Sequence, residues 1–343
     1  MLQLYIYLLF AIQIISFVDR RPRFWAFMST LVVVLFAAFR NGGADFGNYL
    51  KMTDTMRMFD GNFFFAMLIS KDIMVGLINF IAVHILDWVP FVFITFAVLS
   101  GIFRYLISVQ LGRGAVLFCT LYGFFLAPAL DFAAIRAALA IPLIALAMLR
   151  IKLPQRLATA FLAFASHASA LVSAPFAFVN NKISLINGSK IIILSGLFTV
   201  CGYSILLILF PRTAAYSDRD GMIGAYFPIT LMALITLLLR HGDFYKLPAL
   251  RRVYWVSVGL IMPCFIICSS SFILAFRLLE IQCYLLTYTL AHLISLPGSI
   301  LEKRVRICLA FFILFVFLPF KTMYMERTWT LMNEEISYFD LNY

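Results

Sequence analysis

The stretch FWAFMSTLVVVLFAAFRNGGADFGNYL, residues 24–50, joins the features that decide the fold. It begins with an unbroken apolar run that stops at Arg40, and a Gly-Gly pair, Asp45 and Tyr49 follow. The run approaches the roughly 17–25 residues that cross a bilayer as a helix. The stretch therefore predicts a membrane span whose end carries a cation, a flexible loop and a carboxylate.

The composition extends this prediction to the whole chain. Of 343 residues, 64% are hydrophobic and only 13% are charged, and a water-soluble protein of this length needs more polar surface. Apolar runs recur without the alternation of barrel strands. We expect an all-α polytopic integral membrane protein forming one domain, 1–343, with roughly 10–12 transmembrane helices.

The chain separates into clear and ambiguous apolar runs. The clear runs are 2–18, 24–39, 90–108, 114–130, 132–149, 191–210, 222–239, 253–275, 278–298 and 305–320. The segments 66–87 and 157–179 are ambiguous. The alternation of inner and outer loops works if 66–87 does not cross and if 157–179 returns as two short helices, broken near SHASALVSAP. Broken helices at membrane depth are tolerated where they line a cavity.

The net charge of +11 sets the orientation. Lysine and arginine gather in short loops, and the positive-inside rule places such loops in the cytoplasm. These loops are 20–23, 150–156, 240–252 and 303–306. Residues 40–62 and 131–136 and Arg277 then lie on the outer face. No basic block with interleaved aromatic residues is present, so nucleic acid is not an expected partner.

Neither a metal nor a cofactor is predicted. The six cysteines lie in apolar runs without the spacing of metal ligands, and they are interpreted as small core residues. No D-x-D pattern lies in residues 40–62, the loop that carries the candidate carboxylate.

Ionisable residues within or beside the spans are functional candidates, because charge at membrane depth is costly. Arg136 lies about one turn into an apolar helix, and either Asp131 or a substrate anion is its partner. Arg277 has the same alternatives, with Glu280 at i+3. Arg40 either extends to the interface as a helix-ending arginine or contacts substrate.

Three further residues complete the candidate site. Asp45 and Tyr49 are spaced i, i+4, as on one short helix. His167 coincides with the expected break, and both a structural and a catalytic role are open. The three arginines come from distant segments on the same side. Arginine makes bidentate contacts to phosphate and stabilises the charge of a leaving group without a metal, so the set suits a pyrophosphate.

Four segments together resemble EpsG-like membrane proteins. They are RNGGADFGNYL (40–50), IRAALAIPLIALAML (135–149), LAFASHASALVSAPF (162–176) and AFRLLEIQCYLL (275–286), in the family's order. Two flanking positions depart from the family's pattern: Ala137 replaces glutamine, and Ser166 replaces an aromatic residue.

This family belongs with the Wzy-type polymerases of O-antigen, capsule and exopolysaccharide. The resemblance implies a GT-C-like membrane fold and a bacterial inner-membrane enzyme whose site faces the periplasm. It implies transfer between an undecaprenyl-pyrophosphate-linked glycan donor and acceptor, with the membrane lipid and a chain-length regulator protein as further partners. We expect an inverting, metal-independent glycosyltransferase that polymerises oligosaccharide repeat units.

Roles within this reaction follow for the candidates. Arg40, Arg136 and Arg277 would bind the pyrophosphate, and Tyr49 would stack on sugars. Asp45 is the first choice for the general base and His167 the second. A lipid-linked oligosaccharide flippase, a membrane O-acyltransferase and an O-antigen ligase-type glycan transferase are the alternatives. A flippase predicts related halves, which the sequence lacks, and an acyltransferase predicts a histidine near the cytoplasm.

Overall fold

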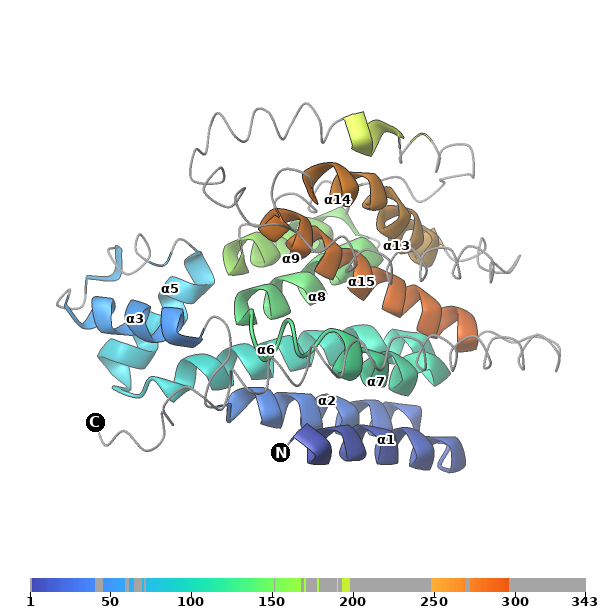
Figure 1. Cartoon of the computed structure of the whole chain (residues 1–343), viewed down its shortest axis with the longest axis horizontal. Coiled ribbons are helices and arrows are strands. Elements are labelled where there is room, and N and C mark those ends of the chain that lie inside the picture. Colours follow the sequence, from blue (N-terminus) through green and yellow to red (C-terminus); the bar gives the residue numbers. More distant parts are fainter. Residues whose placement is uncertain are drawn as a thin grey trace. The chain divides into compact units, whose positions relative to one another are not determined.

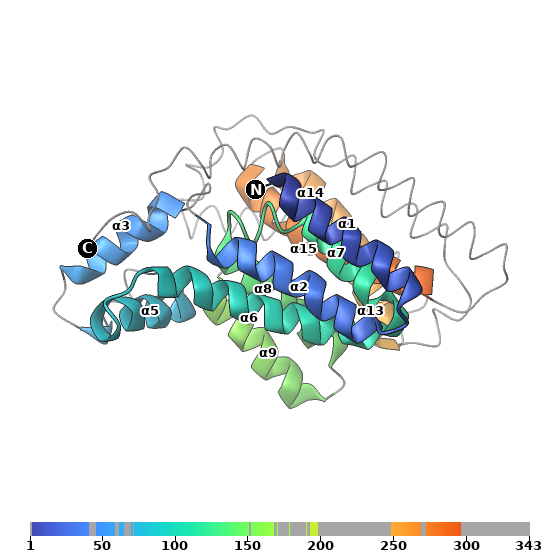
Figure 2. The same ribbon diagram turned by 90° about the horizontal axis from the view of Figure 1, so that it is seen from below.

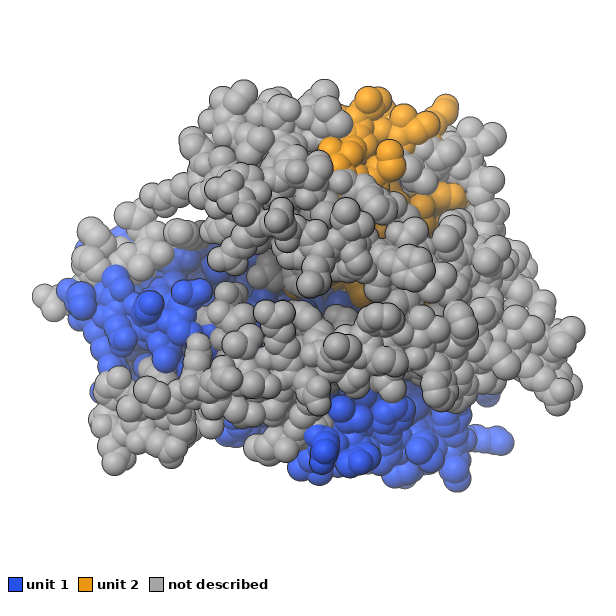
Figure 3. Space-filling view, in the orientation of Figure 1, with its two compact units in different colours: residues 1–143, 159–170, 314–343 blue, residues 144–158, 171–313 orange. Residues whose placement is uncertain are grey.

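The computed structural model is helical in every regular element that it describes. It describes residues 2–40, 46–58, 62–64, 70, 72–150, 152–167, 170, 178, 190, 193–197, 248–268 and 272–295. The chain divides into two compact units, shown in different colours in Figure 3. Unit 1 comprises residues 1–143, 159–170 and 314–343, and unit 2 comprises 144–158 and 171–313. The all-α prediction holds over the described residues, and the single-domain and GT-C-like predictions stay predictions.

Unit 1 is built on α2, which packs against α1, α6 and α7. The helices are α1 (Leu2–Val18), α2 (Pro22–Ala38), α6 (Pro90–Ser108) and α7 (Ala115–Phe125), and Figures 1 and 2 show them side by side. Proline at the first helical position begins both α2 and α6. A Cβ on Gly101 would lie 2.3 Å from Cγ2 of Val34, so this glycine allows α6 to approach α2 closely.

A kink separates α6 from α7. The joining 3₁₀ segment, Val109–Gly114, contains Gly112 with φ 56° and ψ −113°. This left-handed φ favours glycine over residues that carry a Cβ. The continuous helical run Pro90–Phe125 is thus two helices joined at Gly112.

The segment 126–134, between α7 and α8 (Ile135–Leu149), is irregular but buried. Several backbone hydrogen bonds here join residues five positions apart, as from the N–H of Phe132 to the carbonyl of Ala127 at 3.0 Å. Such backbone is tolerated at membrane depth where protein surrounds it. The predicted span 114–130 therefore continues past the true end of α7 at Phe125.

Three further helices of unit 1 or at its boundary bear on the site. They are α3 (Phe46–Arg57), α5 (Ile73–Phe80), which a π-helix continues over Ile81–Ile85, and α9 (Leu153–Ser166). At 1.5 Å per residue, the run Ile73–Ile85 extends about 20 Å, short of a bilayer core of about 30 Å. Residues 66–69 and 71 lie outside the described part of the chain, so the non-crossing of 66–87 stays a prediction. The helix α9 ends one residue before His167, where the break in 157–179 was predicted.

Unit 2 contains α13 (Pro248–Gly259), α14 (Ile261–Cys268) and α15 (Phe272–Ser295), and α15 packs against the other two. Nε2 of Gln282 in α15 donates to the carbonyl of Ser257 in α13 at 2.9 Å. The predicted spans 222–239 and 305–320 and most of 191–210 lie outside the described residues.

Membrane-length helices are fewer in the described residues than the sequence predicts. Of the helices there, the run Pro90–Phe125 is long and apolar enough to cross a membrane, and four apolar helices are shorter. The shorter ones are Gln3–Val18, Pro22–Ala38, Ile73–Ile85 and Ile135–Leu149. The count of 10–12 spans stays a prediction. Large apolar side chains of α1 and α2 are nevertheless exposed, among them Tyr7, Ile14, Phe17, Phe27 and Leu35.

Candidate functional site

Arg136, in the first turn of α8, meets residues from two other helices. Its Nη1 donates to Oδ2 of Asp72 at 2.8 Å, and its Nε donates to the hydroxyl oxygen of Tyr49 at 3.1 Å. The Arg136 side chain is 30% exposed, whereas that of Asp72 is 4% exposed. In the part of the chain that the structure describes, Nη2 of Arg136 makes no hydrogen bond. The guanidinium is therefore held through two of its three nitrogens, and its side chain remains partly exposed.

An aromatic cluster from α3 and α6 orients Tyr49. Phe46, one turn before Tyr49, stacks on Phe93 of α6 with centroids 4.8 Å apart, and Tyr49 meets the same ring edge-on at 6.0 Å. The Arg136 Cζ lies 5.7 Å from the Tyr49 ring centroid. Tyr49 and Phe46 are buried because i and i+3 positions share one face of α3. The cluster fixes the hydroxyl that receives the Arg136 hydrogen bond.

Asp72 is the N-cap residue of α5, yet its side chain does not cap the helix. Its φ of −124° and ψ of 130° are those of an N-cap residue, and aspartate is among the preferred caps. The carboxylate instead bonds Arg136, 64 positions away in the sequence. The bond to Arg136 thus replaces a local capping hydrogen bond, which typically contributes about 1 kcal/mol to helix stability.

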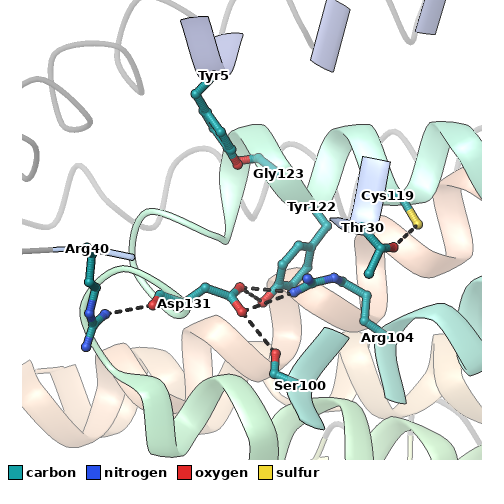
Figure 4. Close-up of polar contacts among 9 residues, drawn as sticks. All are labelled: Tyr5, Thr30, Arg40, Ser100, Arg104, Cys119, Tyr122, Gly123 and Asp131. Atoms are coloured by element: carbon teal, nitrogen blue, oxygen red, sulfur yellow. Dashed lines mark hydrogen bonds and ion pairs between the residues drawn. The ribbon is translucent and has the colours of Figure 1, made fainter. Parts of the chain in front are cut away.

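Arg40 is buried beneath the irregular segment and does not extend to an interface. Its Nη1 donates to the main-chain oxygen of Asp131 at 2.7 Å, as Figure 4 shows. Its Cζ also lies 5.2 Å from the centroid of Phe93, the ring that contacts Tyr49. The helix-ending interpretation is therefore wrong. Arg40 has structural partners, and its contact with pyrophosphate stays a prediction.

Asp131 does not pair with Arg136, which corrects one alternative from the sequence. Its carboxylate accepts from Nη1 of Arg104 at 3.1 Å, from Oγ of Ser100 at 3.0 Å and from the Tyr122 hydroxyl. Figure 4 shows these donors converging from α6 and α7. The side chains of Arg104 and Asp131 are both 0% exposed. The reason for the error is that 126–134 is not helical, so its fold turns Asp131 toward α6.

Sequence reasoning missed Asp72 and Arg104. A signal for Arg104 was present, since it lies inside the predicted span 90–108, where an arginine is a functional or structural marker. Asp72 lies within the ambiguous segment 66–87, and nothing in the sequence around it indicates an ion-pair partner.

Of the three remaining predicted residues, two are described only in part or not at all. Asp45 lies outside the described residues, one position before α3 begins. Arg277 belongs to α15 of unit 2, and its side chain lies outside the described part. His167 follows α9, where its N–H donates to the carbonyl of Ala163 at 3.0 Å. Their roles, and the pairing of Arg277 with Glu280, stay predictions.

Comparison with known proteins decides the family. A model of the EpsG family matches residues 23–339, which include Arg40, Tyr49, Asp72 and Arg136. The chain belongs to the EpsG family. No curated protein and no solved structure matches it. EpsG membership and the apolar helices mark the chain as a membrane protein of polysaccharide biosynthesis.

The arrangement around Arg136 suits the binding of an anion. A guanidinium gives directional, charge-assisted hydrogen bonds to phosphate oxygens, and burial of its partners strengthens them. The carboxylate of Asp72 already binds one nitrogen of this guanidinium. The described part of the candidate site therefore contains a cation and a carboxylate that an incoming anion would meet.

Proposed function

We propose that the chain is a glycosyltransferase that polymerises polyprenyl-pyrophosphate-linked oligosaccharide repeat units. It would act on the periplasmic face of the bacterial inner membrane. The donor would be the growing glycan on undecaprenyl pyrophosphate, and the acceptor a lipid-linked repeat unit. A chain-length regulator protein would be a partner. Membership of the EpsG family supports this class of reaction.

One structural observation carries the proposal. The Arg136 guanidinium lies at the start of α8, fixed by Asp72 and Tyr49 and 30% exposed. Arginine is always charged and matches the geometry of phosphate oxygens, so it suits a pyrophosphate leaving group. An arginine prepared in this way supports group transfer more than passive translocation, because fixed donors stabilise the charge that develops on the leaving oxygen.

The proposed reaction is a single inverting displacement. A hydroxyl oxygen of the acceptor sugar attacks the anomeric carbon of the donor, and the bond from that carbon to the pyrophosphate oxygen breaks. The electron pair leaves with undecaprenyl pyrophosphate, and the hydroxyl proton passes to a base. Asp45 is the proposed base and His167 the second choice. Arg136, with Arg40 and Arg277, would bind the pyrophosphate, and no metal is required.

Reconstitution in liposomes tests the function. Purified protein and one lipid-linked repeat unit are expected to yield a ladder of longer lipid-linked glycans, together with one undecaprenyl pyrophosphate for each bond formed. The products are separated by gel electrophoresis and the released lipid by chromatography. The same ladder is expected with a chelator present.

Other products would identify another function. Movement of the repeat unit across the bilayer without bond formation would contradict the proposal and identify a flippase. Transfer of finished glycan to a different lipid or to protein, with no elongation, would identify a ligase-type transferase.

A further inference from the structure

Asp72 already binds one nitrogen of the Arg136 guanidinium, which the proposed pyrophosphate donor also needs. Nη1 of Arg136 lies 2.8 Å from Oδ2 of Asp72, within the range of strong charge-assisted bonds. A diphosphate that binds Arg136 with two parallel hydrogen bonds would have to compete with this carboxylate. Asp72 is therefore either a permanent part of the bound site or an anion that the diphosphate displaces.

The local structure of α5 favours displacement, because it offers the carboxylate a second place. Asp72 already has the backbone conformation of an N-cap residue, with φ −124° and ψ 130°. In that conformation, an aspartate side chain accepts a hydrogen bond from the N–H of the second or third helical residue. These are Met74 and Val75. Rotation of the Asp72 side chain would bring the carboxylate from Arg136 to this helix terminus.

We propose that Asp72 is a displaceable counter-ion that regulates occupancy of the Arg136 site and release of the diphosphate product. Without ligand, the carboxylate holds Arg136. When the diphosphate binds, Asp72 turns to cap α5, while the Tyr49 hydroxyl keeps its hydrogen bond from Nε of Arg136 and holds the guanidinium in place. After transfer, Asp72 returns to Arg136 and expels undecaprenyl pyrophosphate. The inference rests on the proposed function and gives Asp72 a positioning role, distinct from that of the base.

The need for such a residue follows from the chemistry of repeated transfer. Every added repeat unit leaves one undecaprenyl pyrophosphate in the site, and arginine–phosphate bonds are strong in water-poor surroundings. An internal carboxylate competes at a high effective concentration because the chain tethers it beside its target. Asp72 thus shortens the lifetime of the product complex without entering the displacement itself.

Asp72→Asn separates competition from folding. Asparagine caps helices as well as aspartate does, so α5 keeps its start, but a neutral amide competes poorly with a diphosphate. We expect this variant to bind farnesyl diphosphate roughly tenfold more tightly, as the loss of one hydrogen bond between charged groups implies. Binding to detergent-solubilised full-length protein is measured by calorimetry.

The kinetic signature is a split between two rates. In Asp72→Asn, the rate over many rounds is expected to fall several-fold more than the rate of a single round, because product release becomes limiting. Added undecaprenyl pyrophosphate should inhibit the variant at lower concentration than wild type. A purely structural role for Asp72 would slow both rates equally and weaken binding.

Two variants serve as controls. Asp54→Asn removes the same charge from an exposed position of α3 and is expected to leave binding unchanged. Asp72→Glu keeps a competing anion and is expected to bind the diphosphate no more tightly than wild type. Affinity in Asp72→Asn that is equal to or weaker than wild type would overturn the inference, as would failure of wild type to bind farnesyl diphosphate.

The inference and the proposed function fail in different ways. If wild type binds the diphosphate and Asp72→Asn binds it more tightly, but no polymer forms, the counter-ion role stands and the polymerase function is wrong. If polymer forms and Asp72→Asn binds no more tightly, the function stands and the counter-ion role is wrong.

Discussion

Replacing Arg136 with alanine is expected to reduce polymer synthesis roughly 100- to 1,000-fold, the usual loss when one donor to a developing negative charge is removed. The guanidinium is the partly exposed cation that Asp72 and Tyr49 orient. Alanine leaves the leaving oxygen without that donor. The measurement is the ladder of lipid-linked glycans in cells that lack their own polymerase and express the variant at wild-type levels.

A matched control distinguishes this effect from general loss of charge. Arg57 lies on α3 and also pairs with an aspartate, Asp87, at 3.2 Å, but the pair is on the surface. Surface ion pairs contribute roughly 0–1 kcal/mol, so Arg57→Ala should give a normal ladder. A normal ladder in Arg136→Ala at normal protein level would contradict the account. Arg136→Lys is expected to remain strongly impaired, because an ammonium does not match the bidentate geometry.

Replacing Asp131 with alanine is expected to reduce the free energy of unfolding by about 3–5 kcal/mol, because it leaves the Arg104 charge buried without its partner. Both side chains are fully buried, and the carboxylate also accepts hydrogen bonds from the hydroxyl groups of Ser100 and Tyr122. A loss of this size is a large part of a total of roughly 5–15 kcal/mol. The measurement is the thermal unfolding midpoint in detergent, with the amount of folded protein in membranes.

A double substitution tests whether charge is the cause. Asp131→Asn keeps the shape and an oxygen acceptor but leaves the guanidinium uncompensated, so it should also destabilise the protein. Adding Arg104→Met removes both charges and should recover much of the lost stability. If Asp131→Asn alone were as stable as wild type, the ion pair would not be what stabilises this part of unit 1.

The Asp131 network also explains why the site and the fold are linked. The main-chain oxygen of Asp131 accepts a hydrogen bond from Arg40, and its carboxylate accepts one from Arg104. One residue thus connects the end of α2 with α6. The segment that it stabilises leads directly into α8 and Arg136. Asp131 is therefore a positioning residue for α8, whereas Arg136 is the residue proposed to touch the substrate.

The helices that hydropathy predicts well are those with sharp chemical limits. The predicted spans 2–18 and 90–108 coincide with α1 and α6, because polar residues or an N-terminal proline mark their ends. The end of α7 was missed, because buried irregular backbone is as apolar as buried helix. A hydropathy pattern records burial and does not record which backbone bonds form.

Of the residues that the sequence proposed for the site, the structure brings Tyr49 and Arg136 together, through a hydrogen bond that the sequence did not predict. The carboxylate beside Arg136 is Asp72 and not Asp131, since pairing across 64 positions depends on how α5 and α8 pack. Arg104 carried a signal in the sequence, but its partner lay in a segment that the sequence assigned to the outer face.

Equilibrium binding of farnesyl diphosphate to wild type, Arg136→Gln and Arg57→Gln tests the central claim most directly, because it measures the proposed ligand contact without requiring turnover. The account predicts that wild type and Arg57→Gln bind alike and that Arg136→Gln binds at least roughly tenfold more weakly, as loss of a hydrogen bond between charged groups implies. Equal affinity in all three proteins would contradict the account.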